Sequence, residues 1–168
     1  DHMTARGPDG FGEWTSPDGA VALGHRRLAI IDLSATGAQP MASADGGIVV
    51  VFNGEIYNFA ALRVDLEAAG DVFVSRSDTE VLIHLYRRHG EDMLPRLRGM
   101  FAFALWDSAS RRLLLARDPY GIKPLYWSDD GRVLRFASSV KALQAGGAPS
   151  AIDPAGAVGF CVFGNVPE

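Results

Sequence analysis

The sequence is poor in cysteine and has no long hydrophobic run. Its 168 residues include one cysteine, Cys161, so no disulfide can form within the chain, and no second thiol is present to help hold a metal. The longest apolar segments, residues 48–52 and 101–106, fall well short of the roughly 20 residues that span a bilayer, and no basic-then-apolar leader opens the chain. We therefore expect a soluble, cytoplasmic protein with no membrane partner.

An excess of positive charge is also absent. The chain carries 16 Lys and Arg residues against 20 Asp and Glu residues, which gives a net charge of −4 at pH 7. A protein that binds a polyanion usually shows a basic patch or stripe. We therefore expect no nucleic-acid partner. The hydrophobic fraction of 48% and the charged fraction of 21% are ordinary for a folded domain of this length.

Residues 1–3 resemble a remnant of an expression tag followed by a start methionine, and they are left out of the fold. No internal repeat or low-complexity linker divides the rest of the chain. We expect residues 4–146 to form one domain. The small-residue stretch 145–149 then leads into a C-terminal segment, residues 147–168, that points toward a neighbouring domain.

Hydrophobic patterns and turn residues predict both strands and helices. Strands are expected at residues 21–24, 28–32, 48–53, 72–75, 101–106, 113–118, 125–128 and 133–137. A helix with Asn58 as its N-cap is expected to follow with an apolar stripe of Phe59, Leu62, Leu66 and Ala69, and to end at Gly70. A second begins at the apparent capping box of residues 77–80, and shorter ones are expected at 139–144 and 153–163.

Two of these strands are apolar on both faces. Residues 48–52 and 101–106 carry no alternation of apolar and polar side chains, so each face of their sheet must be covered. The turns between strands are short, which favours antiparallel pairing. The sequence therefore predicts an α+β fold in which mostly antiparallel sheets stack on each other with helices outside.

Generic catalytic and metal-binding patterns are weak. His84 and His89 lie five residues apart, which misaligns them on a helix, so no metal site is expected. His25 has no nucleophile elbow to activate, because G-x-S-x-G is absent. Cys161 lies in an apolar stretch, where a cysteine usually packs as an inert side chain.

A stronger signal is a set of polar residues that interrupt apolar runs: Arg27, Asn53, Gly54, Glu55 and Asp78. A free amino acid needs a cation for its carboxylate and an anion for its ammonium group, and Arg27 and Asp78 are a pair of that kind. Asn53 offers an amide donor and Gly54 a backbone N–H, the two parts of an oxyanion hole.

Each of these residues also has a structural interpretation. Asn-Gly is the commonest hairpin turn, Asp78 suits the first turn of a helix, and Arg27 suits a sheet edge. From spacing alone, the structural interpretations are the stronger ones.

Eight segments of the sequence, taken in order, favour the functional interpretation of these residues instead. They are RGPDG (6–10), HRRLAIIDL (25–33), QPM (39–41), FNGEIYN (52–58), SDTEVL (77–82), GMFAFALWD (99–107), RDPYGIKPLY (117–126) and FASSVKAL (136–143). Together they resemble, in the same order, the glutaminase domain of glutamine-hydrolysing asparagine synthetases. The resemblance covers the chain from Arg6 onward.

The resemblance implies a class II glutamine amidotransferase domain with the four-layer αββα sandwich of the N-terminal-nucleophile hydrolases. L-Glutamine is then the ligand, and its amide is hydrolysed to glutamate and ammonia. On matching positions the substrate-binding residues are Arg27, Leu28, Ile31, Asn53, Gly54, Glu55 and Asp78. Arg27 binds the α-carboxylate, Asp78 holds the α-ammonium group, and Asn53 with Gly54 forms the oxyanion hole.

The resemblance also implies groups that this sequence does not contain. Family members use a cysteine at residue one, whose own α-amino group, with a pKa of about 8, is a better base at neutral pH than a lysine. No such cysteine is present, and Thr4 stands too close to Arg6 to replace it. We therefore expect little or no glutaminase activity from this chain. ATP and Mg²⁺, which activate aspartate in the family, are expected only in a synthetase domain outside this sequence, and no cofactor is expected here.

Loss of an opening strand would expose a sheet edge, so pairing of two copies into a homo-oligomer is a hypothesis. Two further interpretations of function stay open. One is a non-catalytic module that binds glutamine or a partner protein. The other is a related amidotransferase with a different ammonia acceptor, since the acceptor is chosen by the domain that this sequence lacks.

Overall fold

The computed structural model describes residues 2–151 and 154–163, and it divides into two compact units, Asp1–Leu125 and Tyr126–Glu168. The sequence-predicted boundary between residues 146 and 147 falls inside the second unit and stays a prediction. No helix among the described residues is long and apolar enough to cross a membrane.

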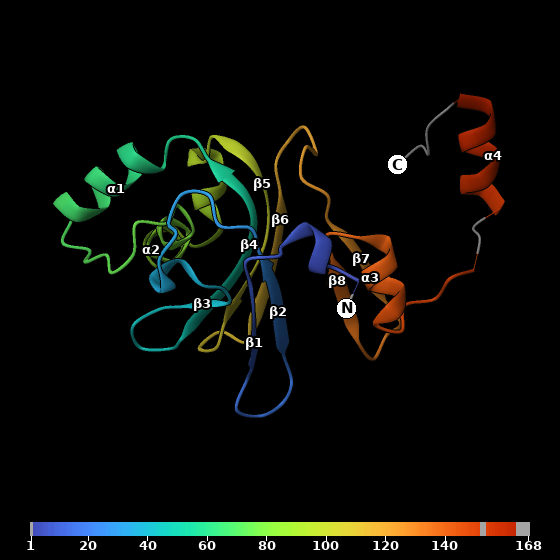
Figure 1. The fold of residues 1–168 in the computed structure, drawn as a ribbon, viewed down its shortest axis with the longest axis horizontal. Helices are drawn as coiled ribbons and strands as arrows, with labels where there is room; N and C mark the ends of the chain where they lie inside the picture. Colours follow the sequence, from blue (N-terminus) through green and yellow to red (C-terminus); the bar gives the residue numbers. More distant parts are fainter. Residues whose placement is uncertain (1, 152–153, 164–168) are drawn as a thin grey trace. The chain divides into compact units, whose positions relative to one another are not determined.

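The first unit is built on a four-stranded antiparallel sheet with the strand order β3-β4-β5-β6 (Figure 1). Its strands are β3 (Met41–Ala42), β4 (Ile48–Ile56), β5 (Gly99–Asp107) and β6 (Arg112–Arg117). A separate antiparallel hairpin joins β1 (Gly10–Thr15) to β2 (Ala22–Arg27). The helices are α1 (Phe59–Ala68) and α2 (Thr79–His89), with 3-10 turns η1 (Thr4–Arg6), η2 (Ala35–Gly37) and η3 (Gly90–Arg96).

Both faces of the four-stranded sheet are covered, as its apolar strands require. Val50, Phe52 and Ile56 of β4 belong to one core cluster with residues of α2. The alternate residues Val49 and Val51 are also buried, on the face that the hairpin β1–β2 covers (Figure 1). The unit therefore stacks a helical layer, a sheet and a hairpin.

The second unit pairs β7 (Tyr126–Asp129) with β8 (Leu134–Ala137) in an antiparallel hairpin. Helix α3 (Val140–Ala145) packs on this hairpin, and α4 (Pro154–Phe163) follows. All strand pairs among the described residues are antiparallel, as the sequence predicted. Asp153, where the sequence-predicted last helix begins, lies outside the described residues.

Two sequence-predicted strands are wrong. Residues 28–32 form a loop after β2, because the Asp32 carboxylate accepts the Ser34 N–H (2.8 Å) and the Arg76 N–H (2.9 Å) and so folds the chain back. Residues 72–75 are also a loop, in which the Glu80 carboxylate accepts the N–H groups of Val74 and Ser75 that a neighbouring strand would otherwise bind. The strand β1 was not predicted, since its glycines mask the pattern.

The predicted helix caps are also wrong in detail. The Asn58 side chain does not cap α1 but bonds to the backbone of Arg96 (3.0 Å) and Arg98 (2.9 Å). At α2, Glu80 does not reach back to Ser77, because loop residues 74 and 75 occupy its carboxylate. Gly70 does have the predicted positive φ, 97°.

Candidate functional site

The peptide groups of β4 point alternately toward β5 and toward β3. The Tyr57 N–H donates to the Arg98 carbonyl (2.7 Å), so the odd-numbered residues bond to β5. Phe101, which lies opposite Gly54, turns its own N–H and C=O to Asp118 on its other side. In an antiparallel ladder such alternation persists along the strand. The even-numbered residues 48, 50, 52, 54 and 56 therefore present their N–H and C=O groups to the β3 edge.

Strand β3 pairs with β4 only near the start of β4. Along the rest of that edge of β4, side chains bind the backbone instead. Beyond Val50, the Phe52 N–H donates to Gln39 Oε1 (2.6 Å), and the Phe52 carbonyl lies 3.2 Å from His25 Nε2. Farther along, the Ile56 N–H donates to Asp78 Oδ2 (2.9 Å). Three side chains thus take the place of a neighbouring strand.

Gly54 lies between the bonded residues Phe52 and Ile56, and its own peptide group faces the same edge of β4. Within residues 2–151 and 154–163, no hydrogen bond occupies its N–H on that side, and none engages the amide of the adjacent Asn53. Consecutive even-numbered residues of a strand are about 7 Å apart. An N–H donor and a free amide therefore stand next to each other, about 7 Å from the groups bound by His25 and by Asp78.

Asn53 and Gly54 are not a hairpin turn, which was the stronger structural interpretation of the sequence. They lie inside the nine-residue strand β4. Glycine is required here for another reason: Gly54 has a φ of 156°, and a Cβ on it would overlap the Met100 carbonyl oxygen and lie 2.7 Å from the Phe101 Cα. The close approach of β5 therefore excludes every other residue type.

Asp78 is buried, with 4% of its surface exposed, and it does not cap α2 with its side chain. Burial raises the pKa of its carboxyl group above the ordinary value, and the negative charge of Glu55 raises it further, against the opposing effect of the Ile56 N–H. A buried carboxylate of this kind is stabilised by a cation. The Asp78 carboxylate therefore lies beside Ile56, two residues along β4 from Gly54, in surroundings where a cation would stabilise its charge.

Arg27 lies at the end of β2, on the same face of the hairpin as His25. Its guanidinium donates to the Ser34 carbonyl (2.8 Å) and to the Asp32 carbonyl, so it holds the loop that follows β2. A guanidinium has five N–H donors, and these two contacts leave others for a carboxylate. Because Asp32 in turn binds the Arg76 N–H, the loop connects Arg27 to the segment just before Asp78.

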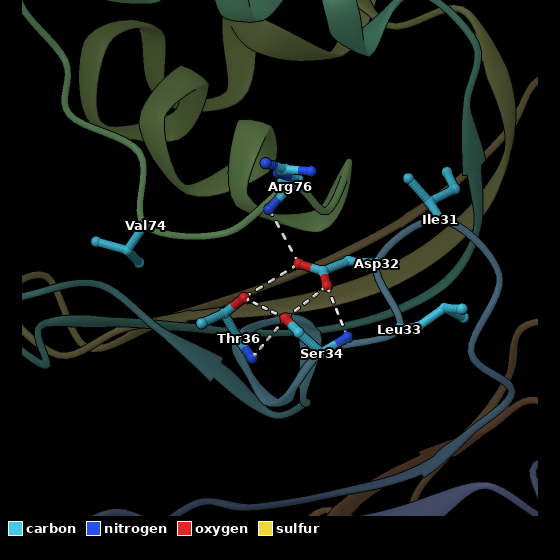
Figure 2. Close-up of a pocket in the computed structure, with 7 residues that line it drawn as sticks. All are labelled: Ile31, Asp32, Leu33, Ser34, Thr36, Val74 and Arg76. Carbon is cyan, nitrogen blue, oxygen red and sulfur yellow. Dashed lines mark hydrogen bonds between the residues drawn. The ribbon is translucent and has the colours of Figure 1, made fainter.

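An open pocket of about 360 Å³ lies in this loop region (Figure 2). Figure 2 shows the Asp32 carboxylate at its centre, bonded to the Ser34 and Thr36 hydroxyls (2.6 and 3.1 Å) and to the Arg76 N–H. These bonds hold the pKa of Asp32 well below its usual range, the Ser34 hydroxyl contributing most. The lining residues are Ile31, Asp32, Leu33, Ser34, Thr36, Val74 and Arg76.

The structure brings the residues singled out by sequence together only in part. Ile31 lines the pocket, whereas Leu28 does not and is 55% exposed. Asn53, Gly54 and Glu55 follow one another on β4, and Asp78 contacts the end of that strand. Arg27 is linked to them through the loop. The roles of these residues toward a substrate stay predictions.

Sequence reasoning missed three residues that build the site. His25 was rejected as a base, yet its ring binds the strand next to Asn53. Its Nδ1 is buried without a partner among the described residues, and burial lowers its pKa. Gln39 was noted only within a segment. Asp32 had a usable signal, since D-x-S-x-T is a pattern typical of side chains that bind the backbone of a turn.

The other sequence predictions concern residues outside this region. No cluster of three or more His, Cys, Asp or Glu side chains that could hold a metal occurs in the part of the chain that the structure describes. His84 bonds to Asp71 (3.1 Å) and lies against the Phe73 ring at a tilt of 41°, with 13% of its side chain exposed, so it packs between these residues rather than on the open helix surface that the sequence predicted. Cys161 is exposed on α4, so the prediction that it packs as a buried side chain is wrong.

In the part of the chain that the structure describes, the Gly54 N–H and the Asn53 amide thus lie without hydrogen bonds on one strand edge, near the buried Asp78 carboxylate and linked to Arg27 by a loop. The family model described as a glutamine amidotransferase domain matches residues 1–167, so the chain belongs to this family.

Among named relatives, asparagine synthetase [glutamine-hydrolyzing] 1 of Bacillus subtilis is 44% identical over 163 residues, which cover 97% of this chain and 25% of that protein. Asparagine synthetase [glutamine-hydrolyzing] 3 of Arabidopsis thaliana is 47% identical over 83% of this chain and 23% of its own length. Amidase chry2 of Gibberella zeae is 44% identical over 88% of this chain and 22% of its length. The chain spans about a quarter of these curated relatives.

A solved structure supports the fold. Glutamine phosphoribosylpyrophosphate amidotransferase of Bacillus subtilis superposes with a TM-score of 0.66 at 31% identity, over 76% of this chain and 29% of that one. The α+β sandwich of mostly antiparallel sheets is therefore confirmed, and so is the glutamine amidotransferase class.

Proposed function

We propose that this domain binds L-glutamine along the open edge of β4 and serves, in a longer protein, as the glutaminase part of an asparagine synthetase. The observation that carries the proposal is that no hydrogen bond from the described residues occupies the edge-facing N–H of Gly54 or the amide of the adjacent Asn53. Two donors in this arrangement stabilise the oxyanion that forms when a nucleophile attacks an amide carbonyl.

The charged residues supply the recognition of an amino acid. Arg27 binds the α-carboxylate with the guanidinium donors that the loop leaves free, and Asp78 binds the α-ammonium group. Leu28, Ile31 and Glu55 adjoin the ligand. The ligand's ammonium group then offsets the cost of a buried carboxylate at Asp78, because an opposite charge stabilises the ionised form.

Hydrolysis of the amide and use of the ammonia require groups other than these binding residues. The resemblance implies a nucleophilic cysteine with its own α-amino group as base, and the prediction that this chain releases little ammonia is checked by a direct ammonia assay. ATP and Mg²⁺ would act in the synthetase domain, where aspartate receives the ammonia. The proposal also includes a cytoplasmic location. It further includes self-association of the chain, which light scattering checks.

A second candidate acceptor has a specific observation in its favour. The relative named as an amidase is as similar to this chain, at 44%, as asparagine synthetase 1. A glutaminase domain that delivers ammonia to an acceptor other than aspartate fits the same site. A module that binds glutamine without hydrolysing it is the third candidate.

Calorimetric titration of this chain with L-glutamine tests the binding step. We expect saturable binding that Arg27→Ala and Asp78→Ala both abolish, while Arg132→Ala, on the turn between β7 and β8, leaves it unchanged. D-Glutamine, which presents its charged groups in mirror-image order, should bind weakly. If both site variants keep the affinity of the native chain, the assignment of Arg27 and Asp78 is wrong.

A further inference from the structure

The Gln39 side chain makes two hydrogen bonds to segments far apart in the sequence. Its Oε1 accepts the Phe52 N–H at 2.6 Å, and its Nε2 donates to Thr79 Oγ1 at 3.3 Å. Both partners are almost completely inaccessible, with Phe52 5% and Thr79 1% exposed. Buried polar groups of this kind require partners, so the Gln39 amide satisfies one group on each segment.

Both partners are next to residues of the proposed site. Phe52 immediately precedes Asn53 and Gly54 on β4, and Thr79 immediately follows Asp78 at the start of α2. The Thr79 hydroxyl also accepts a hydrogen bond from the Ser77 hydroxyl at 3.0 Å, so the contact extends to both sides of Asp78. One uncharged side chain therefore connects the proposed oxyanion donors to the proposed ammonium ligand.

The second direct link between these segments is the bond from the Ile56 N–H to Asp78. The two links bracket Gly54, one at the residue two positions before it and one at the residue two positions after it. With both in place, the strand and the helix start are held at two points. Loss of the first would leave the bond at Asp78, the group that the substrate is proposed to use, as the one hydrogen bond between the two segments among the described residues.

The backbone at Gln39 is itself held in place. Gly12 of β1 packs so closely on this backbone that a Cβ on Gly12 would overlap the Gln39 carbonyl oxygen and lie 3.2 Å from the Pro40 Cδ. The hairpin β1–β2 thus fixes the base of the side chain, and the side chain spans from there to β4 and α2.

From these contacts we infer that Gln39 is a positioning residue of the glutamine site, which sets the separation between the Gly54 N–H and the Asp78 carboxylate without touching the substrate. This inference rests on the proposed function for the identity of the ligand. A glutamine molecule has a limited distance between its α-ammonium group and its amide carbonyl, so both ends bind together only where that separation is maintained.

The test compares two variants of Gln39 with a matched control. Gln39→Leu removes both hydrogen bonds with little change in size, whereas Gln39→Glu keeps an acceptor for the Phe52 N–H and for the Thr79 hydroxyl. The control is Gln144→Leu, the same substitution at an exposed position of α3. Three quantities are measured: the Kd for L-glutamine by calorimetry, the exchange rate of the Phe52 amide proton, and the titration of the Asp78 carboxyl by NMR.

For Gln39→Leu we expect the Kd to rise roughly tenfold and Phe52 exchange to accelerate by a similar factor, the scale of one net hydrogen bond. Titration of Asp78 should shift toward that of an ordinary carboxyl group as its surroundings loosen. Gln39→Glu should restore the Kd to within about twofold of the native value, and Gln144→Leu should change none of the three.

The outcomes separate this inference from the proposed function. A native Kd in Gln39→Leu would overturn the inference, as would a loss of affinity that Gln39→Glu does not restore. If the native chain does not bind glutamine, the proposed function fails, and the inference is then decided by the other two measurements. Unchanged Phe52 exchange and unchanged Asp78 titration in Gln39→Leu would overturn it.

Discussion

Replacement of Gly54 by alanine should lower the free energy of unfolding more than the same replacement of other glycines in the strands. In the native chain the backbone of β5 approaches so closely that an added Cβ would overlap the Met100 carbonyl oxygen. The backbone is also in a conformation, φ 156°, that residues with a Cβ rarely adopt. Both effects act at a peptide group in the middle of the core sheet, where neither strand can move freely.

The magnitude comes from these two contributions. Overpacking of a well-packed interior costs about 1–3 kcal/mol, and a residue held in a sparsely populated backbone region costs on the order of 1–3 kcal/mol more. We therefore expect Gly54→Ala to lower the free energy of unfolding by about 2–6 kcal/mol. This is a large part of the total stability of a typical domain.

Two other glycines provide controls for the two contributions. A Cβ on Gly99 would overlap the Glu55 carbonyl oxygen and lie 3.0 Å from the Ile56 Cα, but Gly99 has no positive φ, so Gly99→Ala should show the packing cost alone, about 1–3 kcal/mol. A Cβ on Gly24 of β2 would meet nothing within 4 Å. Gly24→Ala should be neutral or stabilising by about 0.5 kcal/mol, because alanine reduces the freedom of the unfolded chain.

The assay is equilibrium unfolding in urea, with the midpoint and the slope compared among the three variants and the native chain. The expected order of stability is Gly24→Ala, then Gly99→Ala, then Gly54→Ala. If Gly54→Ala unfolds within about 0.5 kcal/mol of the native chain, the reasoning from close approach and backbone conformation is refuted.

Three further substitutions test the charged groups. Burial raises the pKa of Asp78, so its contribution to stability is present at low pH and lost as pH rises through that pKa; Asp78→Asn should therefore raise the urea midpoint at pH 7. In the native chain, glutamine affinity should fall as pH falls through the same pKa, which lies above 3.8, and Asp78→Asn should bind no glutamine at any pH. At Asp118, burial alone would raise the pKa of the carboxyl group. Hydrogen bonds from four backbone N–H groups outweigh that effect and lower this pKa; they come from Ile122, Lys123, Phe101 and Tyr120. The stability that Asp118 provides is thus present above the unfolded-state pKa and lost as pH falls through the folded-state value. Asp118→Asn should cost about 3 kcal/mol at pH 7 and less in acid, by urea unfolding at several pH values; a cost that does not depend on pH would contradict this. Arg27→Lys should weaken glutamine binding about tenfold by calorimetry, because an ammonium group cannot hold two loop carbonyls and a carboxylate in one plane; unchanged affinity would count against a bidentate contact.

The core strands could be predicted from the sequence because apolar side chains on both faces require burial whatever the surroundings. Residues 48–53 and 101–106 fall within β4 and β5 for this reason. Residues 28–32 and 72–75 were mispredicted as strands from their apolar content, although several of these side chains are exposed, Ile30 to 71% and Val74 to 77%. Their shape is set by the carboxylates of Asp32 and Glu80, which bind backbone N–H groups, and such bonds leave no periodic pattern in a sequence.

In the candidate site, too, residue types could be predicted from the sequence, whereas contacts between distant residues could not. Asn-Gly is a turn in most contexts, and only the pairing of β4 with β5 over nine residues shows that Asn53 and Gly54 lie within a strand. Asp78 was identified by type but not by partner, since the Ile56 N–H lies 22 residues away in the chain. The contacts of Gln39 with Phe52 and Thr79, 13 and 40 residues distant, are likewise a product of the fold.

An open donor on a strand edge is ordinarily a hazard, because an edge of unpaired N–H and C=O groups recruits another strand. Here the positions on either side of Gly54 are already bound, by Gln39 and His25 at Phe52 and by Asp78 at Ile56. An incoming peptide strand would need all of these groups at once, and it would have to displace three side chains to reach them. A small ligand needs only the Gly54 N–H. The same contacts that close the edge to a strand therefore leave it open to one carbonyl oxygen, which is the selectivity that the proposed glutamine site requires.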